Sequence, residues 1–332
     1  MLGKLPQDLL AQLLQKYCQP DSRVIIGPRV GEDATVIDFG ETLLVAKTDP
    51  ITFVTEDIGW YVINVNANDI ATMGAIPRWF LATVLLPADS SPDLAEEIFS
   101  SIHRAASALG ISLCGGHTEF TSGLDRPIVV GQMLGEVKRE DLVCSSGAKA
   151  GDEILLTKGL AVEATSIIAR EKGEELLPQY GKEFLERCRD FLYHPGISVL
   201  REARLACQTT KVHAMHDPTE GGVATALQEL AKASDVGLAI DGDQLFIREE
   251  SRVLCERFGL DPLGVISSGA LLIVVAKEES QKVMEKIQGV GIECRRIGEV
   301  REKSFGLKIR KEGKLKELPS FERDEITKLF GV

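Results

Sequence analysis

Four short polar segments in the first half of the sequence carry the residue types that bind metal ions and phosphates. They are Gly31-Glu32-Asp33-Ala34, Lys47-Thr48-Asp49-Pro50, Asn64-Val65-Asn66-Ala67-Asn68-Asp69 and Gly115-Gly116-His117-Thr118-Glu119. Carboxylate oxygens are the hard ligands that Mg²⁺ prefers, and Mg²⁺ in proteins is usually shared with substrate phosphates. Because clustered carboxylates repel a bare polyphosphate, a divalent cation between them makes an acidic nucleotide site workable. The segments therefore predict a site for magnesium and a phosphate-bearing ligand.

Individual residues in these segments suit different parts of such a site. The candidate metal ligands are Asp33, Asp49, Asp69 and Glu119. Gly115 and Gly116 would let backbone N–H groups approach a phosphate closely, and Lys47 would add a point charge. A Gly-Gly pair also makes an ordinary turn, and for this pair alone that interpretation is the simpler one.

The third polar segment lies in a predicted helix. Asn66 and Asp69 are three residues apart and share one face, while Val62, Val65 and Met73 form a core-facing stripe. Three asparagines and an aspartate inside a helix contradict intrinsic helix propensity. Such a conflict is expected where function overrides stability, although a solvated helix face would also tolerate it.

A further polar motif, Asp217-Pro218-Thr219-Glu220-Gly221-Gly222, lies in the second half of the sequence. It follows a predicted strand and opens a predicted helix, so backbone N–H groups at the helix start would face an anionic part of a substrate. Asp217 is equally suited to be a plain N-cap, with Pro218 at the first helical position. The two interpretations are compatible.

Histidines offer one candidate and one rejected site. His117, inside the fourth segment, is a candidate phosphate donor or acid–base group, or else an exposed turn residue without a role. His213 and His216 belong to an HxxHD string, but on a strand they point to opposite faces. That geometry argues against a shared zinc site.

The elements that must position these residues alternate between strands and helices in both halves of the sequence. The first half predicts strands over 24–26, 34–37, 43–46, 79–86, 111–114 and 128–137 and helices over 57–73 and 91–110. The second half predicts strands over 153–157, 212–216, 271–276 and 294–300 and helices that begin near residues 162, 183, 198, 222 and 280. Each of the four polar segments then falls where a strand ends or a helix turns.

Length and charge place this alternation in a two-domain protein. The chain has 332 residues, of which 44% are hydrophobic and 27% charged, as expected for folded globular domains. A small, Gly-containing stretch at 145–152 separates two apolar segments, so we place domains at 1–150 and 151–332. The net charge is −12, and residues 1–150 hold 19 acidic and 11 basic side chains, which argues against nucleic-acid binding.

Membrane, secretory and disulfide classes are disfavoured. No apolar run approaches the ~20 residues that span a bilayer, and residues 1–6 lack a signal-peptide core, which predicts a cytoplasmic protein. The seven cysteines are scattered singly without a CxxC pair. We therefore expect neither a zinc site nor a disulfide framework, and we expect most thiols to be reduced and buried.

Five motifs, in order along nearly the whole chain, resemble those of the aminoimidazole ribonucleotide (AIR) synthase superfamily, also called PurM-like. They are Gly31-Glu32-Asp33-Ala34, Thr48-Asp49, Asn68-Asp69-Ile70-Ala71-Thr72-Met73-Gly74-Ala75, Gly115-Gly116-His117-Thr118-Glu119 and Asp217-Pro218-Thr219-Glu220-Gly221-Gly222. Members include AIR synthase, selenophosphate synthetase, thiamine-monophosphate kinase and the hydrogenase maturation factor HypE. The sequence is most similar to the HypE branch.

The resemblance implies an α/β (α+β) architecture of two domains. The N-terminal α/β domain would pair into a dimeric β-barrel, the C-terminal domain would be an α/β sandwich, and ATP and Mg²⁺ would bind near the dimer interface. The implied metal ligands are Asp33, Asp49, Asp69 and Glu119. The implied nucleotide contacts are Lys47, Thr48, Asn66, Asn68, Gly115, Gly116 and Thr118. The implied catalytic residues are Asp69, His117 and Asp217.

The implied chemistry is phosphoryl transfer from ATP to an amide- or carbamoyl-type oxygen of a small-molecule or protein-bound acceptor, with hydrogenase maturation proteins as partners. The sequence departs from relatives in two places. It ends in Lys328-Leu329-Phe330-Gly331-Val332 without the terminal cysteine of HypE, and it has Gly-Gly-His-Thr-Glu where AIR synthase has Gly-Gly-Glu-Thr-Ala. The alternatives are a non-catalytic nucleotide-binding maturation partner and a small-molecule kinase resembling thiamine-monophosphate kinase.

Overall fold

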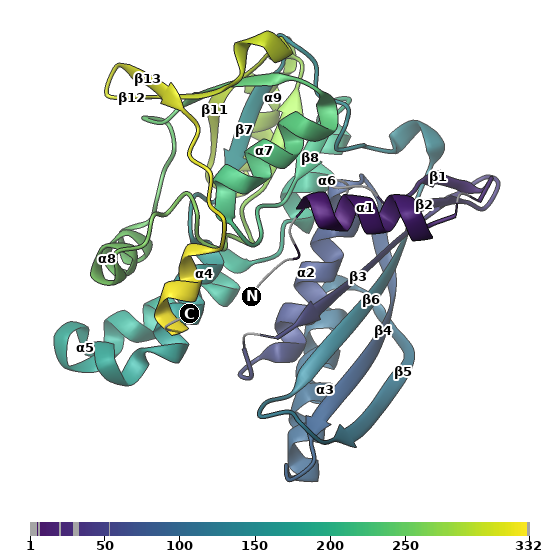
Figure 1. Cartoon of the computed structure of the whole chain (residues 1–332), viewed down its shortest axis with the longest axis vertical. Helices are drawn as coiled ribbons and strands as arrows, with labels where there is room; N and C mark the ends of the chain where they lie inside the picture. Colours follow the sequence, from purple (N-terminus) through teal and green to yellow (C-terminus); the bar gives the residue numbers. More distant parts are fainter. Residues whose placement is uncertain (1–4, 6, 20, 29–32, 53, 331–332) are drawn as a thin grey trace. The chain divides into compact units, whose positions relative to one another are not determined.

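The computed structural model describes residues 5, 7–19, 21–28, 33–52 and 54–330, and the chain divides into two compact units (Figure 1). The N-terminal unit consists of Gln19–Pro28 and Asp33–Leu142. The C-terminal unit contains the chain from Val143 onward together with helix α1 (Gln7–Tyr17). The mixed α/β class that the sequence predicts is confirmed, while the domain boundary at residue 150 stays a prediction.

The N-terminal unit is a sheet covered by helices. Its elements are β1 (Val24–Ile26), β2 (Thr35–Asp38), β3 (Leu43–Ile51), α2 (Ile58–Thr72), β4 (Ile76–Pro87), α3 (Pro92–Leu109), β5 (Ser112–Thr121) and β6 (Ile128–Val137). The strand order is β1-β2-β3-β6-β4-β5, and only the pair of β4 and β5 is parallel. β5 therefore forms one edge of the described sheet.

Alternating side chains build the core of this unit. Val129, Met133 and Val137 of β6 are buried, and α2 packs on β3, β4 and β6. α3 packs on α2 and has the caps that its sequence predicts. The Ser91 hydroxyl accepts a hydrogen bond from the Asp93 N–H at 3.1 Å, and Gly110 takes the left-handed conformation. One face of the sheet is thus packed on helices, as in other antiparallel sheets.

Strand β3 runs further than the sequence predicts. It pairs with β2 only over Leu43–Ala46 but continues to Ile51 along β6. The predicted end of this strand at residue 46 was therefore wrong, and Lys47-Thr48-Asp49-Pro50 lies within the last five residues of β3. Pro50 is tolerated because β2 does not pair with this part of β3, so its missing N–H breaks no bond of that ladder.

The C-terminal unit is built around a second sheet. Its strands are β7 (Glu153–Thr157), β8 (Ala214–His216), β9 (Gly237–Asp241), β10 (Leu272–Val275), β11 (Cys294–Arg301), β12 (Leu307–Lys311) and β13 (Lys314–Glu317), in the order β13-β12-β9-β11-β7-β10-β8. Its later helices are α4 (Val162–Glu171), α5 (Gly173–Asp190), α6 (Leu200–Thr209), α7 (Gly222–Ser234), α8 (Glu249–Phe258) and α9 (Lys277–Gln288). β7 and β10 are buried at every residue, which requires cover on both faces.

The structure also bears on the expectations for the cysteines and for membrane-spanning helices. All seven cysteines are free, as expected, but of these only Cys188, Cys255 and Cys294 are buried, so the expectation that most thiols are buried was wrong. Among the described residues, no helix is long and apolar enough to cross a membrane.

Candidate functional site

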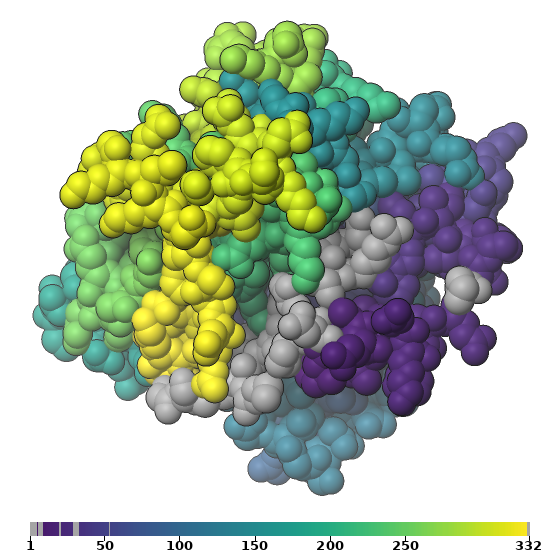
Figure 2. Space-filling model, turned by 45° about the horizontal axis from the view of Figure 1, so that its top comes forward, coloured from purple at the N-terminus to yellow at the C-terminus, as the bar shows by residue number. Residues whose placement is uncertain are grey.

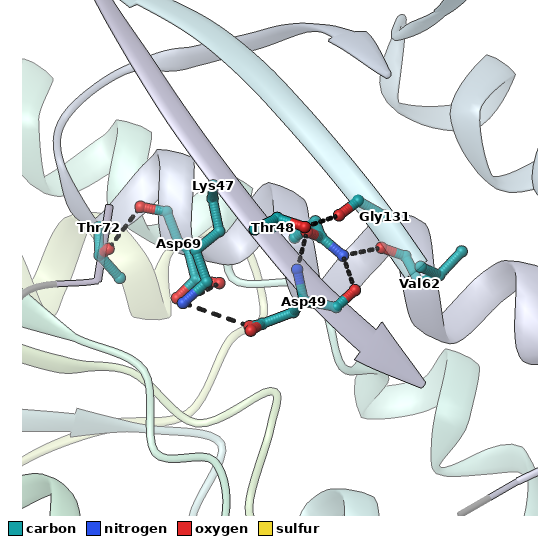
Figure 3. Close-up of polar contacts among 8 residues, drawn as sticks. Lys47, Thr48, Asp49, Val62, Asp69, Thr72 and Gly131 are labelled. Carbon is teal, nitrogen blue, oxygen red and sulfur yellow. Dashed lines mark hydrogen bonds and ion pairs between the residues drawn. The ribbon is translucent and has the colours of Figure 1, made fainter. Parts of the chain in front are cut away.

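A lysine and two aspartates converge where β3 passes α2. The Nζ of Lys47 lies 3.3 Å from Oδ2 of Asp49 and 3.3 Å from Oδ2 of Asp69 (Figure 3). Lys47 and Asp49 are two residues apart on β3 and so share a face, whereas Asp69 comes from α2. The Asp69 side chain is only 6% exposed, so its charge is strongly coupled to the Lys47 ammonium. Sequence analysis assigned Asp49 and Asp69 to a metal site and Lys47 to the adjoining phosphate, and the structure brings the three side chains together, while their roles stay predictions.

Asn66 holds the backbone of Asp49. Its Oδ1 accepts a hydrogen bond from the Asp49 N–H at 2.9 Å, and its Nδ2 donates to the carbonyl oxygens of Asp49 at 3.3 Å and Val62 at 2.9 Å. The side chain is fully buried. Asn66 thus pairs with one residue of β3 much as a neighbouring strand would. Its role as a direct nucleotide contact stays a prediction.

Gly131 of β6 makes room for this arrangement. It is the register partner of Asp49. A Cβ at this position would lie 2.5 Å from Nδ2 of Asn66. The carbonyl oxygen of Gly131 also accepts a hydrogen bond from the Thr48 hydroxyl at 2.8 Å. Sequence reasoning did not identify Gly131. The available signal was a glycine in the middle of a predicted strand, next to the polar residue Gln132.

Helix α2 buries its polar residues rather than exposing them. Asn64, Asn66, Asn68 and Asp69 are all at most 4% exposed, which rules out the solvated-face interpretation. Hydrogen bonds within the helix offset part of the free-energy cost of burying these polar groups. Asn64 Nδ2 donates to the Trp60 carbonyl at 2.8 Å, and the Thr72 hydroxyl donates to the Asp69 carbonyl at 2.8 Å. The conflict with helix propensity therefore marks a buried polar site.

Asp33 lies beside the same part of the sheet. It is 7% exposed and stands two residues before Thr35, which pairs with Ala46 of β3. A shared site of Asp33 with Asp49 and Asp69 stays a prediction. Its neighbours in the motif, Gly31 and Glu32, lie outside the described residues.

The fourth polar segment is part of a strand, so the interpretation of Gly115-Gly116 as a turn was wrong. Both glycines lie inside β5, which pairs in parallel with β4. A Cβ on Gly116 would lie 1.9 Å from the Ala82 carbonyl oxygen, and Gly116 has a φ of 147°. This close approach of two strands explains the requirement for glycine.

His117 and Glu119 form an exposed pair on β5. Nε2 of His117 lies 3.0 Å from Oε2 of Glu119, and Thr118 between them points to the opposite face. Their side chains are 65% and 49% exposed. β5 is three strand positions from β3, a separation of roughly 14 Å at the usual strand spacing. One N-terminal unit therefore does not bring Glu119 to Asp49 and Asp69.

The Asp217 motif lies in the C-terminal unit. Asp217 follows β8 and is 2% exposed, but the N-cap of α7 is Gly221, so the N-cap interpretation of Asp217 was wrong. The two nearby histidines bind different acids, His213 with Asp152 at 2.8 Å and His216 with Glu229 at 2.9 Å. A catalytic role for Asp217 stays a prediction.

Family comparisons agree with this two-unit organisation. Residues 31–137 match the model described as AIR synthase related protein, N-terminal domain, and residues 149–310 match the C-terminal domain of the same description. Together the two matches contain every candidate site residue.

Three curated relatives cover most of the chain. A hydrogenase expression/formation protein of Methanocaldococcus jannaschii is 28% identical over 289 residues, which are 85% of this chain and 83% of the relative. Carbamoyl dehydratase HypE of Cupriavidus necator is 28% identical over 76% of this chain and 70% of the relative. Thiamine-monophosphate kinase of Pyrococcus horikoshii is 27% identical over 87% of this chain and 88% of the relative.

Solved structures share the fold at lower identity. Hydrogenase maturation protein HypE in complex with ATP has a TM-score of 0.73 and 22% identity over 95% of this chain and 91% of its own. A chain of the HypE–HypF complex has a TM-score of 0.77 and 23% identity, over 94% and 99%. On the matches of both its halves, the chain belongs to the family of AIR synthase related proteins.

Proposed function

We propose that this protein is an ATP- and Mg²⁺-dependent enzyme that phosphorylates an amide- or carbamoyl-type oxygen of an acceptor. The observation that carries the proposal is the charged group of Lys47, Asp49 and buried Asp69. Asn66 holds the Asp49 backbone, and the group lies inside the segment that matches the N-terminal family domain. Relatives named carbamoyl dehydratase indicate the class of acceptor.

The donor set suits magnesium. Asp33, Asp49 and Asp69 offer carboxylate oxygens, two of them on largely buried side chains, and no soft ligand lies among them. When bound, the cation would neutralise charge on the transferred phosphoryl group. Lys47, which contacts both Asp49 and Asp69, would turn its ammonium group toward a phosphate oxygen.

Other predicted residues have supporting roles in this proposal. Thr48, Asn68, Gly115, Gly116 and Thr118 would contact the nucleotide. His117 and Asp217 would hold or move a proton at the acceptor, as general acid–base groups. Transfer of the γ-phosphoryl group to the acceptor oxygen would release ADP and convert that oxygen into a leaving group.

We also propose that the protein works as a homodimer. β5 is an edge strand whose residues Leu113 and Phe120 are 38% and 48% exposed, and such an edge is a template for strand pairing. Glu119 is too far from Asp49 within one unit to share a ligand with it. A second copy that approaches along β5 would supply the missing carboxylate.

The names of the relatives support a proposal about the cellular setting. Several act in hydrogenase maturation, and one similar chain was solved as the HypE–HypF complex. We propose a cytoplasmic role in hydrogenase maturation with a protein partner of this kind.

Nucleotide binding is the first test. Isothermal titration of the purified full chain with ATP and MgCl₂ should give saturable binding that is lost without magnesium. Asp69→Asn should weaken this binding at least tenfold. Asp125→Asn, at an exposed site of the same unit, is the matched control and should bind like the wild type. Absence of ATP binding in the wild type would reject the proposal.

Product analysis separates the candidate reactions. A relative named thiamine-monophosphate kinase favours a second candidate, in which the product keeps the phosphoryl group. Incubation with ATP, Mg²⁺ and carbamoyl-bearing or phosphate-bearing small molecules, followed by mass spectrometry, distinguishes a dehydrated acceptor from a phosphorylated one. ATP binding without ADP release for any acceptor would favour the non-catalytic partner instead.

A further inference from the structure

A cavity of about 400 Å³ lies within the C-terminal unit, lined mainly by residues of α5, of the short turn η2 (Leu192–Gly196) and of the start of α8. α5 and α8 pack against each other and lie side by side at the left of the molecule in Figure 2, in teal and green. The volume suits a small metabolite. No residue that lines the cavity belongs to the proposed nucleotide and acceptor site.

Arg248 lines this cavity with a donor that lacks an acceptor. Its Nε is buried and has no hydrogen-bond partner among the described residues. Arg187, which lines the same cavity, is paired instead, with its Nε 3.1 Å from Oε1 of Glu250 and its Nη1 3.4 Å from Oε1 of Glu183. A buried N–H donor without an acceptor destabilises a fold, and a ligand that supplies the acceptor would remove this cost.

The other charged groups of the cavity are matched with one another. Glu250 is paired with Arg187, and Oδ2 of Asp190 lies 3.1 Å from Nδ1 of His194. Helix α8 begins directly after Arg248 without a side-chain cap, so its first N–H groups add positive potential there. The two carboxylates would repel a polyphosphate, whereas a single negative charge is attracted to Arg248 at lower cost. The charges therefore favour a monoanion.

Two apolar side chains, Phe191 and Pro195, line the cavity together with these charged groups. They favour a ligand with an apolar body, because contact removes nonpolar surface from water. A guanidinium presents parallel N–H groups in one plane, which match the two oxygens of a carboxylate. We propose that the cavity binds a small monocarboxylate with an apolar or aromatic body, whose carboxylate accepts hydrogen bonds from Arg248. This site is additional to the proposed phosphoryl transfer and does not depend on it.

Benzoate is the probe for this site, since it carries one carboxylate on an apolar ring. Isothermal titration of the purified full chain with benzoate should give saturable binding in the millimolar range. Benzamide, its neutral counterpart of similar shape, should bind at least about tenfold more weakly, because it offers no charged acceptor. Inorganic phosphate at the same concentration should not displace benzoate. Absence of saturable benzoate binding, or displacement by phosphate, would overturn the proposal.

Two variants with opposite expected effects locate the binding site. Arg248→Gln removes the guanidinium charge and should weaken benzoate binding at least about tenfold. Glu250→Gln removes a negative charge from the cavity and frees Arg187, so it should tighten benzoate binding about threefold. Arg257→Gln, at the other end of α8 and paired with Glu175, is the matched control and should bind like the wild type.

The gain of affinity keeps the test decisive if Arg248→Gln folds poorly, because misfolding does not tighten binding. Circular dichroism of each variant shows whether it is folded. Unchanged benzoate binding by folded Arg248→Gln would place the ligand elsewhere and overturn the proposal. Weaker binding by folded Glu250→Gln would equally contradict it, since the carboxylate of Glu250 would then support the ligand rather than repel it.

Discussion

The side-chain amide of Asn66 forms hydrogen bonds with both backbone polar groups of Asp49, the N–H at 2.9 Å and the carbonyl oxygen at 3.3 Å. An asparagine of a helix therefore fixes the position of a carboxylate on a strand. Since Asp49 and Asp69 share the Lys47 ammonium, this pairing sets the spacing of the charged group as a whole.

Asn66→Ala should lower stability and nucleotide binding together. The change removes the side-chain partner of the partly buried Asp49 N–H and carbonyl oxygen, at a cost of about 2–4 kcal/mol in the free energy of unfolding. Urea denaturation and ATP titration measure the two effects. Asn64→Ala is the control, because within the part of the chain that the structure describes the Asn64 side chain bonds the Trp60 carbonyl of its own helix and nothing on β3. It should leave ATP binding unchanged. Equal binding by both variants would contradict a positioning role.

Gly131→Ala should disturb the same site from the opposite side. Its Cβ would lie 2.5 Å from Asn66 Nδ2 and 2.8 Å from the Phe80 ring, so packing must shift at a cost of about 1–3 kcal/mol. Gly27→Ala, whose Cβ would make an ordinary 3.6 Å contact with Val24, is the matched control in the same unit. Thermal denaturation compares the two, and equal melting temperatures would show that the site adapts without strain.

Mixed dimers test whether Glu119 acts across the proposed interface. Asp69→Asn and Glu119→Gln should each be inactive, but a 1:1 mixture that exchanges subunits should recover about one quarter of wild-type ADP release, since a two-fold dimer then has one intact site in half of the molecules. The double variant mixed with either single variant is the control without an intact site. No recovery in a mixture shown by mass to contain heterodimers would mean that each site uses its own Glu119.

Glu163→Gln should stabilise the protein in a pH-dependent way. The pKa of Glu163 is raised from 4.5 to about 7 in the folded state, so the folded form resists ionisation and loses stability as the pH rises through this interval. The gain from the variant should be about 2 kcal/mol larger at pH 8 than at pH 5. Glu171→Gln, at the exposed end of the same helix, should show no such trend in urea denaturation.

Elements with strong local signals were predictable from the sequence. Helix α3 has Ser91 and Gly110 at its ends and an apolar stripe between them, and its predicted bounds agree with the structure within a residue. The strand β6 was predicted over its full length because Val129, Met133 and Val137 mark one apolar face along a segment rich in β-branched residues. Local chemistry was sufficient in these places.

Elements whose form depends on distant neighbours were not predictable. β5 continues through Gly115-Gly116 because Gly116 fits against the Ala82 carbonyl of β4, a contact that local turn rules do not contain. The hairpin of β12 and β13 is charged and exposed, so it lacks the apolar alternation of a half-buried strand. Sequence analysis identified Asn66 as a polar residue of a helix. Its partner, the backbone of Asp49, could not be predicted, because the contact depends on how α2 packs against β3.

The placement of α2 and β4 in the N-terminal unit has a spectroscopic consequence. The sequence has two tryptophans, Trp60 in α2 and Trp79 in β4, so all tryptophan emission comes from that unit. Far-ultraviolet circular dichroism, in contrast, reads the helices of both units. Comparison of the two signals during denaturation follows the halves separately in the intact, unlabelled chain, and noncoincident transitions would show that they unfold independently.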